Sequence, residues 1–463
     1  MRRETVSKSD YLGERAIVVG GGIAGLSAAR AVSDRFREVV ILDRDKLPDG
    51  VIPRPGVPQG KHPHGLLAGG LKALEELFPG FGDELRKVGA VPLNRGLDLL
   101  YEIPGLDPWP RINIDHPTYA LTRPLLELTV RQRVARVSNI KVRGGCRVVN
   151  IIADPGTGAA TDICYYTSQG KLETLRSDLI IDASGNGSVT LEFLKASRRT
   201  LPEETCIEVN MHYSSTLLDH ANIGDNYKVA YTLPDAPKDN RGGLLLPAEN
   251  GTYQLVLIGR GENIPPLKES EFRTYALKLH TPTIYNAIKN AKLLSEIAPC
   301  SFKQSRWRHF AQVFDFPRGL LPIGDAICRF NPVYGQGMSS ALRQACLLSE
   351  LLGRSNQDLL STLPQDFLSK AEDIVAEPWA MSAVPDFVYP DTTGVRPEGL
   401  EERLNFQKGL SRLAARDAGV FELLSDVRNL LKPLKALDDP SIVSKVESEL
   451  TSELSLSSAA TAA

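Results

Sequence analysis

A glycine cluster near the N-terminus is the first part of the sequence whose residue types and spacing could support chemistry. The run Gly20-Gly21-Gly22-Ile23-Ala24-Gly25 has the spacing G-x-G-x-x-G and follows the apolar segment 15–19. In this pattern the first glycine permits a tight turn and the second lets the backbone approach a pyrophosphate. The third lets a helix pack closely on the strand, and the helix N-terminus offers free N–H groups to phosphates. The candidate contacts are Gly20, Gly22, Ala24 and Gly25.

A carboxylate stands at the expected distance beyond this cluster. The apolar run 39–42 ends on Asp43, which follows Gly25 by 18 residues. An acidic residue about 20 residues after the glycines is typical of a group that accepts hydrogen bonds from ribose hydroxyls. Arg44 comes next and is placed near the adenosine half of a dinucleotide. The sequence therefore predicts dinucleotide binding, although the glycine motif alone does not distinguish FAD from NAD.

A second group of chemically informative residues lies in the last third of the chain. Gly324-Asp325 follows the apolar segment 319–323, and Asn-Pro-Val-Tyr-Gly-Gln-Gly-Met at 331–338 opens a helix. Glycines at such a place keep side chains away from a planar ring. The helix N-terminus would stabilise negative charge, such as that near N1 of a reduced flavin.

Together these segments resemble the two flavin-binding signatures of the class A flavoprotein monooxygenases, which have the para-hydroxybenzoate hydroxylase fold. The resemblance implies FAD as the cofactor, with Asp325 on the ribityl chain and with Gly335, Gly337 and Met338 beside the isoalloxazine ring. It also implies the reaction. Reduced flavin meets dioxygen and forms a C4a-hydroperoxide, whose distal oxygen passes to an electron-rich carbon. NAD(P)H is the implied electron donor, either directly or through a separate flavin reductase.

Other positions follow from the same resemblance. Arg123 stands at a helix start where the family places a flavin-contacting residue, and Val148 matches a strand position whose backbone meets adenine. The segment 182–188 is similar to the family's middle motif, Asp-Gly followed by Ser and Arg. Here Ala-Ser precedes the glycine and no arginine follows, so a role of this segment toward nicotinamide does not carry over.

The segment 54–67, Arg-Pro-Gly-Val-Pro-Gln-Gly-Lys-His-Pro-His-Gly-Leu-Leu, resembles bacterial natural-product enzymes near the polyether polyene epoxidases. Its His62 and His64 have no carboxylate or cysteine beside them, which argues against a metal site. We expect this loop to shape the flavin pocket.

The predicted function is an FAD-dependent monooxygenase that acts on a small apolar substrate and uses O2, by epoxidation of an alkene or hydroxylation of an aromatic carbon. Hydroxylation of a phenol would gain from a base, and the sequence identifies none, which favours epoxidation. His212 and Tyr213 are the candidate pocket residues. Because neighbours on a strand face opposite sides, we expect at most one of them to point inward.

Two other functions share this fold: a saturating reductase of the geranylgeranyl reductase type, and a non-catalytic escort protein. The Gly335-Gln336-Gly337 run argues against the escort, which needs no loop beside the ring. The Trp-x-Trp-x-Ile-Pro signature of the related halogenases is absent, and so are the G-x-S-x-G and Walker A motifs.

The elements that must position these residues follow from hydrophobic periodicity. Apolar runs at 15–43, 179–182 and 319–325 predict buried parallel strands. From residue 205 the apolar positions alternate, and Asn250-Gly251 marks a hairpin, so an antiparallel sheet is expected there. The fold class is α/β: a discontinuous Rossmann-type FAD-binding domain, an inserted antiparallel β-sheet substrate domain and a helical C-terminal region. The predicted bounds are 14–96, 120–200 and 308–365 for the FAD-binding domain, 97–119 and 201–307 for the substrate domain, 366–450 for the helical region and 451–463 for a disordered tail.

The amino-acid composition excludes several other classes of protein. Of 463 residues 42% are hydrophobic and 24% are charged, which is ordinary globular composition. With 54 Lys and Arg against 56 Asp and Glu, no basic excess recruits nucleic acid or an acidic membrane surface. We find no apolar run near the ~18 residues of a transmembrane segment and no signal-peptide core. Six dispersed cysteines without a C-x-x-C pair favour a reduced, cytoplasmic setting.

Overall fold

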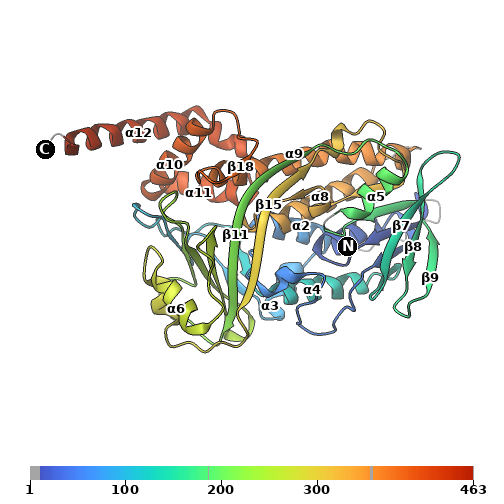
Figure 1. Ribbon diagram of the computed structural model, residues 1–463, viewed down its shortest axis with the longest axis horizontal. Helices are drawn as coiled ribbons and strands as arrows, with labels where there is room; N and C mark the ends of the chain where they lie inside the picture. The colour runs from blue at the N-terminus through green and yellow to red at the C-terminus, as the bar shows by residue number, and fades with distance from the viewer. Residues whose placement is uncertain (1–10, 186, 355–357, 462–463) are drawn as a thin grey trace.

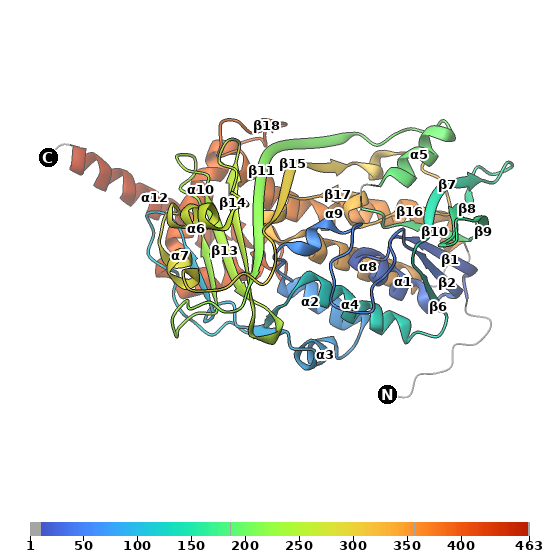
Figure 2. The same cartoon turned by 60° about the horizontal axis from the view of Figure 1, so that its bottom comes forward.

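The computed structural model describes residues 11–185, 187–354 and 358–461 of the chain. Its first layer is a five-stranded sheet, seen edge-on at one end of the molecule in Figure 2, with the strand order β16-β10-β1-β2-β6 and parallel pairing throughout. The three segments that the sequence predicted as buried parallel strands therefore lie together in one sheet. The strands are β1 (Gly13–Val19), β2 (Phe36–Leu42), β6 (Ile140–Arg143), β10 (Leu179–Asp182) and β16 (Leu320–Pro322).

Both faces of this sheet are covered, because successive side chains of each strand point to opposite sides. Val18 of β1 packs into a core with Leu26 and Leu342, from the helices on one face. Ile17 packs with Ile163 and Phe193 on the other face. Each such fully buried side chain stabilises the fold by ~1.5–3 kcal/mol. The first face carries α1 (Ile23–Ser33), α2 (Ala68–Leu77), α4 (Arg123–Ala135) and α8 (Gly337–Leu352); the second carries α5 (Ser188–Ala196) and the three-stranded sheet of β7 (Arg147–Ala153), β8 (Ala160–Tyr166) and β9 (Leu172–Arg176).

The second large sheet has the order β17-β15-β11-β14-β13-β12-β4, and β18 (Thr393–Gly394) pairs with β11. Its pairings are antiparallel except that β12 and β4 run parallel. Figure 1 shows β11 and β15 as two long strands side by side across the middle of the molecule. The strands are β4 (Leu99–Glu102), β11 (Glu204–Leu218), β12 (Val229–Thr232), β13 (Gly242–Pro247), β14 (Tyr253–Arg260), β15 (Ala298–Arg308) and β17 (Cys328–Arg329).

The predicted α/β fold class, with an antiparallel sheet inserted into a parallel one, is confirmed. The hairpin expected at Asn250-Gly251 joins β13 to β14, and Asn250 has a φ of 60° there, the left-handed conformation that this turn chemistry allows. Outside the sheets already described and the C-terminal helices, the chain forms α3 (Phe81–Lys87), α6 (Glu269–Leu277), α7 (Thr283–Ile288), β3 (Val91–Leu93) and β5 (Thr118–Ala120).

The C-terminal region consists of helices, the first of which packs along α8 and contributes to the core of the parallel-sheet half. They are α9 (Leu359–Asp386), α10 (Leu400–Arg416), α11 (Ala418–Arg428) and α12 (Pro440–Thr461). A separate core holds α10, α11 and α12 against Trp109 and Ile114. The predicted disordered tail is corrected here, because α12 continues to Thr461 and projects from the body in Figure 1. Alanine, leucine and glutamate favour helix and outweigh the serines of this segment; residues 462–463 lie outside the described residues.

No helix among the described residues combines the length and the apolar character that crossing a membrane requires.

Candidate active site

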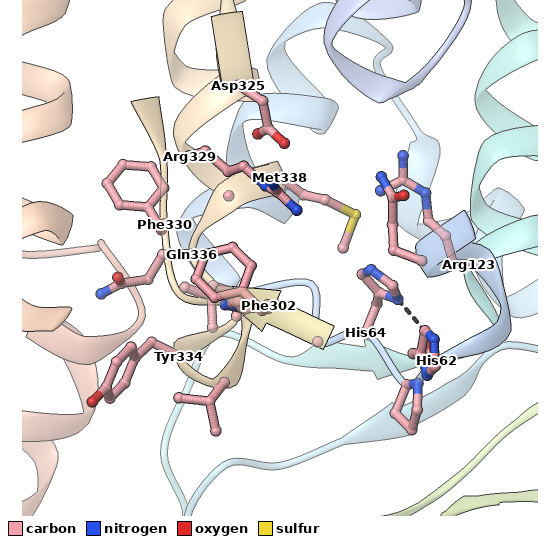
Figure 3. Close-up of a pocket in the computed structure, with 18 of the residues that line it drawn as sticks. His62, His64, Arg123, Phe302, Asp325, Arg329, Phe330, Tyr334, Gln336 and Met338 are labelled. Atoms are coloured by element: carbon pink, nitrogen blue, oxygen red, sulfur yellow. Dashed lines mark hydrogen bonds between the residues drawn. The ribbon is translucent and has the colours of Figure 1, made fainter. Parts of the chain in front are cut away.

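One cavity of about 1270 Å³ lies between the two sheets, and residues of α9, α10 and α11 also line it. We divide it by its lining residues. The glycine half is lined by Gly20, Gly22, Asp43, Arg123 and Asp325, and the tyrosine half by Tyr101, Tyr213, Tyr231, Asp386 and Arg428. The segment 332–338 lines the cavity between these two groups of elements. Figure 3 shows this region, with Asp325, Met338, His64 and Arg123 around one side and Tyr334 and Gln336 toward the other.

The glycine cluster connects β1 to α1 and leaves open space at the N-terminus of the helix. Gly20 has a φ of 103°, a left-handed conformation that a glycine adopts without strain. A Cβ on Gly25 would collide with the carbonyl oxygen of Gly20, so Gly25 does not line the cavity but lets helix and strand pack. A Cβ on Gly22 would meet no atom closer than Arg54 Nη2 at 3.9 Å. The first turn of α1 contains no acidic residue, which leaves its N-terminus suited to an anion.

Asp43 directly follows β2 and lines the cavity, but its carboxylate already has several partners. Oδ2 accepts from the Gly21 backbone N–H at 2.6 Å, Oδ1 accepts from the Asp45 N–H at 2.8 Å, and Arg54 Nη1 donates to both oxygens. A carboxylate has about four acceptor sites. The predicted contact with ribose hydroxyls would therefore need one of these partners to move, and in this structure Asp43 fixes the glycine loop.

Arg54 is a functional candidate that the sequence did not single out. Its buried guanidinium contacts Asp43, Asp45 at 2.8 Å and Glu127 at 2.6 Å. The carboxylates of Glu127 and Asp43 raise the pKa of Arg54 above its usual value, against the effect of burial. Three charge-assisted pairs tie the start of the 54–67 loop to β2 and to α4. The only signal in the sequence was the position of Arg54 at the start of a segment rich in Pro and Gly.

Arg123 and Asp325 carry charges in the cavity whose hydrogen-bonding capacity is not used. Arg123 begins α4 behind the N-cap Thr122, and its Nε is buried without a hydrogen-bond partner among the described residues. Its one ion pair, with Glu127, is long at 3.6 Å, and burial lowers its pKa. Asp325 has no hydrogen-bonded partner in the described ranges, and burial raises the pKa of its carboxyl. Burial of charged groups without hydrogen-bond partners is unfavourable in free energy. Both side chains are therefore available to bind a ligand.

Between Asp325 and α8, glycine backbone lines the cavity beside the side chains of Arg329, Phe330 and Tyr334. Gly335 has a φ of 69°, and a Cβ on it would meet its nearest atom only at 3.9 Å. Gly337 begins α8 and Met338 follows it, both on the cavity wall. The side-chain oxygen of Gln336 is buried without a partner among the described residues. A flat ring could approach the glycine part of this wall closely; the place of Gly335, Gly337 and Met338 beside a flavin ring stays a prediction from the family resemblance.

The two histidines of the 54–67 loop are neutral. His62 Nδ1 lies 2.8 Å from Ser215 Oγ, and His64 Nδ1 lies 2.8 Å from the carbonyl oxygen of His62 (Figure 3). Burial lowers the pKa of His62 to about 4 and that of His64 to about 3. Both line the cavity, as expected for a loop that shapes it. Within the described part of the chain no three His, Cys, Asp or Glu side chains are grouped to hold a metal ion.

The residues of the glycine half fit a flavin dinucleotide. An open helix N-terminus and the free Nε of Arg123 suit a pyrophosphate, and the unpaired Asp325 suits ribityl hydroxyls. Of the other predicted contacts, Ala24, Arg44 and Val148 line the same cavity. In the middle motif, the Asp182 carboxylate accepts hydrogen bonds from the backbone N–H and hydroxyl groups of Ser184 and Thr190. Asn186 of that motif lies outside the described residues.

In the tyrosine half, only one of the two predicted pocket residues is present. Tyr213 lines the cavity and is buried, and its hydroxyl lies 3.3 Å from Asn331 Oδ1. His212 does not line the cavity, because as the next residue on β11 it points to the other face of the sheet, where its Nδ1 lies 3.1 Å from Ser301 Oγ. The prediction of His212 as a pocket residue is therefore corrected.

A buried carboxylate that sequence analysis missed stands beside Tyr213. Asp386, 2% exposed, lies at the end of α9 and accepts hydrogen bonds from Asn331 Nδ2 at 2.9 Å and from the Tyr334 hydroxyl at 3.2 Å. Its Oδ2 has no partner among the described residues. Burial raises the pKa of Asp386 to about 6. No sequence pattern pointed to it, since it lies 55 residues after Asn331, to which it is hydrogen-bonded.

The comparisons with known proteins agree with this geometry. A family model described as "NAD(P)-binding Rossmann-like domain" matches residues 18–68. Protein Rv3254 of Mycobacterium tuberculosis is 30% identical over 398 residues, which cover 82% of this chain and 81% of that protein.

Two solved structures have a fold similar to that of this chain. The p-nitrophenol 4-monooxygenase PnpA from Pseudomonas putida DLL-E4 has a TM-score of 0.63 at 17% identity, over 90% of this chain and 99% of that one. The myxobacterial chondrochloren halogenase CndH, an FAD-dependent halogenase, has a TM-score of 0.63 at 16% identity, over 90% and 97%. The fold is that of the FAD-dependent monooxygenases and their halogenase relatives, as the sequence resemblance implied.

Proposed function

The chain belongs to the family of Protein Rv3254, and from that premise we propose that it is an FAD-dependent monooxygenase. One atom of dioxygen enters an alkene or aromatic carbon of an apolar natural-product intermediate, and the other leaves as water. NAD(P)H supplies the two electrons, directly or through a separate flavin reductase. One observation carries this proposal: the glycine half and the tyrosine half are a single cavity, joined at the segment 332–338. A cofactor in one half and a substrate in the other would meet there.

The residues of the glycine half would hold FAD, which when bound supplies the redox chemistry that activates dioxygen. The N-terminus of α1 at Gly22 and the Arg123 guanidinium bind the anionic pyrophosphate. Asp325 accepts hydrogen bonds from ribityl hydroxyls. Arg44 and the backbone near Val148 border the adenosine. Gly335 and Gly337 leave room for the ring, and the N-terminus of α8 stabilises negative charge on it.

The tyrosine half would orient the substrate and exclude water. Tyr213 and Tyr231 lie on its wall together with apolar side chains of the antiparallel sheet. Burial raises the pKa of both tyrosines, so they stay neutral donors. A wall of this kind keeps water from a reactive oxygen species and holds the acceptor carbon in place.

The Asp386 carboxyl bears on whether the proposed reaction is epoxidation or hydroxylation. The absence of a recognisable base in the sequence favoured an alkene. The structure contains a buried carboxyl on the wall of the tyrosine half, with one unpartnered oxygen and a pKa near 6. A group of this pKa is suited to accept a proton from a phenol near neutral pH. Epoxidation and hydroxylation therefore both remain in the proposal.

The test is a turnover experiment under isotopically heavy dioxygen. The FAD-loaded protein receives NADPH, with and without an added flavin reductase, and a set of apolar alkenes and phenols. The proposal expects a product that carries one heavy oxygen atom and is not formed without dioxygen. A product two hydrogens heavier that forms equally well without air would instead identify a saturating reductase. Absence of any product, with FAD bound, would favour the escort protein.

A further inference from the structure

Arg428, the last residue of α11, is a charged group on the cavity wall that the proposed reaction does not use. It lines the tyrosine half and is exposed. Yet the surrounding protein desolvates its guanidinium and lowers its pKa. These two observations agree if the accessible surface of Arg428 faces the cavity rather than the outside of the molecule. Its position at a helix C-terminus is favourable for a cation but supplies no counter-charge inside the cavity.

No group of the described chain neutralises this charge. Arg428 has no ion pair and no hydrogen bond there; its one contact of that kind is with a ring. The carboxylates of the region have other partners. Asp426, two residues earlier, pairs with Arg95 at 2.9 Å and with Lys432 at 3.2 Å. Asp386 accepts hydrogen bonds from Asn331 and Tyr334 through Oδ1, and its unpartnered Oδ2 makes no ion pair with Arg428. A desolvated cation without a partner is costly unless a ligand supplies the anion.

Arg428 lies against a series of aromatic side chains that carry no charge. Its guanidinium carbon lies 4.9 Å from the centre of the buried Trp109 ring. The Trp109 ring lies 5.0 Å from that of Tyr101, which lies 5.7 Å from that of Tyr231. Burial raises the pKa of both tyrosines, so neither carries a negative charge. The cation–π contact with Trp109 stabilises the guanidinium and leaves its N–H groups available.

Much of the remaining wall of the tyrosine half is apolar, although Arg95, Arg260 and Gln407 also line the cavity. Leucine, valine and methionine side chains from β12, β13, α9, α10 and α11 line it: Val229, Leu244, Leu246, Met381, Leu410, Leu424 and Val427. A ligand that fits these walls is a hydrocarbon or an aromatic skeleton. A ligand that also pairs with Arg428 carries one negative group, and a carboxylate matches the planar fork of a guanidinium with two parallel hydrogen bonds.

We infer that the tyrosine half contains an anion subsite, in which Arg428 binds the carboxylate of an apolar carboxylic acid. This inference rests on the proposed function and deepens it: the substrate of the monooxygenase is an acid with a long apolar body, anchored by its head group while the body extends toward the 332–338 segment. Arg428 is a specificity-determining residue rather than a catalytic one, because it selects the head group and fixes how far the body reaches.

A binding experiment with a matched pair of probes tests this inference without any turnover. Dodecanoate and dodecan-1-ol share their hydrocarbon body and differ in charge. Their affinities for the FAD-loaded protein are measured by calorimetry and by quenching of tryptophan fluorescence, below the micellar concentration. We expect dodecanoate to bind more tightly than the alcohol. Arg428→Gln should weaken dodecanoate about 10–100-fold, the effect of a lost charge-assisted pair, and leave the alcohol unchanged. Arg428→Lys should restore part of the preference.

The control variant is Arg396→Gln, which removes an exposed arginine that lies 5.4 Å from the Phe387 ring and does not line the cavity. It should bind both probes like the wild type. An equal affinity for acid and alcohol in the wild type overturns the inference, as does unchanged selectivity in Arg428→Gln or failure of dodecanoate to bind at all. Selective loss of NADPH affinity in Arg428→Gln would overturn it in favour of a cofactor-phosphate site. The FAD content of each protein is measured first. If the chain takes up no FAD, the proposed function is wrong. The comparison of dodecanoate with dodecan-1-ol still tests whether Arg428 forms an anion subsite.

Discussion

In the glycine half of the cavity Arg54 contacts three carboxylates, whereas in the tyrosine half Arg428 contacts none among the described residues. Arg54 is neutralised by the protein and ties the 54–67 loop to β2 and α4. Arg428 lacks such compensation, and in the glycine half Arg123 has only the long ion pair with Glu127 at 3.6 Å. The comparison separates cations that organise the fold from cations that face a ligand.

The two halves also differ in how their residues are joined along the chain. The glycine half is made from short continuous segments, most of which follow a strand of the parallel sheet, whereas Arg123 follows β5 of the small antiparallel sheet. The tyrosine half is made from single residues of the antiparallel sheet and of the C-terminal helices, separated by up to about 300 positions. A substitution in the glycine half should therefore affect FAD, and one in the tyrosine half should affect the substrate or local stability.

The largest effect is expected from Gly22→Val. The valine side chain would fill the open space at the N-terminus of α1, where the nearest atom to a Cβ is 3.9 Å away. We expect FAD affinity to fall about a hundredfold or more, because overpacking costs ~1–3 kcal/mol and the phosphate contact is lost as well. The ratio of FAD to protein after gel filtration measures this. Gly156→Val, in an exposed turn away from the cavity, should retain FAD; equal retention by both variants would contradict the assignment of the glycine half.

A smaller loss of FAD is expected from Asp325→Ala. Hydrogen bonds from ribityl hydroxyls to a carboxylate contribute ~1.5–3 kcal/mol, so affinity should fall about 10–100-fold. Titration of FAD into the stripped protein measures it, with Asp154→Ala in an exposed turn as the control. Unchanged affinity in a folded Asp325→Ala protein would mean that the second flavin signature is misassigned.

Asp386→Asn should alter stability in a pH-dependent way. The carboxyl has a folded pKa of about 6 against an ordinary value of 3.8, so the folded state binds this proton more tightly than the unfolded state. Its ionisation therefore destabilises the wild type as the pH rises from about 4 to 6. Relative to wild type, the variant should gain about 1–3 kcal/mol in unfolding free energy between pH 4 and pH 8, since asparagine can still accept from Asn331 and Tyr334. Urea unfolding at both pH values tests this; a difference that does not depend on pH would refute it.

The smallest effect is expected from His212→Ala. Because His212 faces away from the cavity toward Ser301, its removal should change unfolding free energy by less than ~0.5 kcal/mol and should leave FAD content and dodecanoate affinity unchanged. Thermal unfolding and the probe titration measure both quantities. A weakened affinity for the probe would return His212 to the binding site.

The glycine half could be predicted from the sequence to a greater extent than the tyrosine half. The apolar strand runs are local in the chain, and their periodicity was sufficient to predict the parallel sheet. The residues along the glycine half were indicated by the glycine motif and, for Arg123, Val148 and Asp325, by the family resemblance. Asp43 shows the limit of this reasoning, because its partner Arg54 belongs to a loop whose course no periodicity describes. The end of the chain is another limit: its serines suggested disorder, whereas the structure continues α12 to Thr461.

The tyrosine half could not be predicted in the same way. Asp386 and Arg428 lie in helices whose apolar spacing predicts only that they are helices. Their place on the cavity wall depends on how α9 and α11 pack against the antiparallel sheet, which is a long-range property. The alternation at 205–214 did predict β11, and with it the choice between His212 and Tyr213, but not which face of the strand lies toward the cavity.

The central claim is that the glycine half holds FAD, and titration of three nucleotides into the stripped protein tests it most directly. FAD, FMN and NAD⁺ share parts of one chemical structure, and the glycine motif alone suits FAD and NAD⁺ equally well. Because Arg123 and Asp325 lie in the same cavity, we predict that FAD binds with one molecule per chain and at least about tenfold more tightly than either of the others. Tight binding of NAD⁺ with no uptake of FAD would contradict the account.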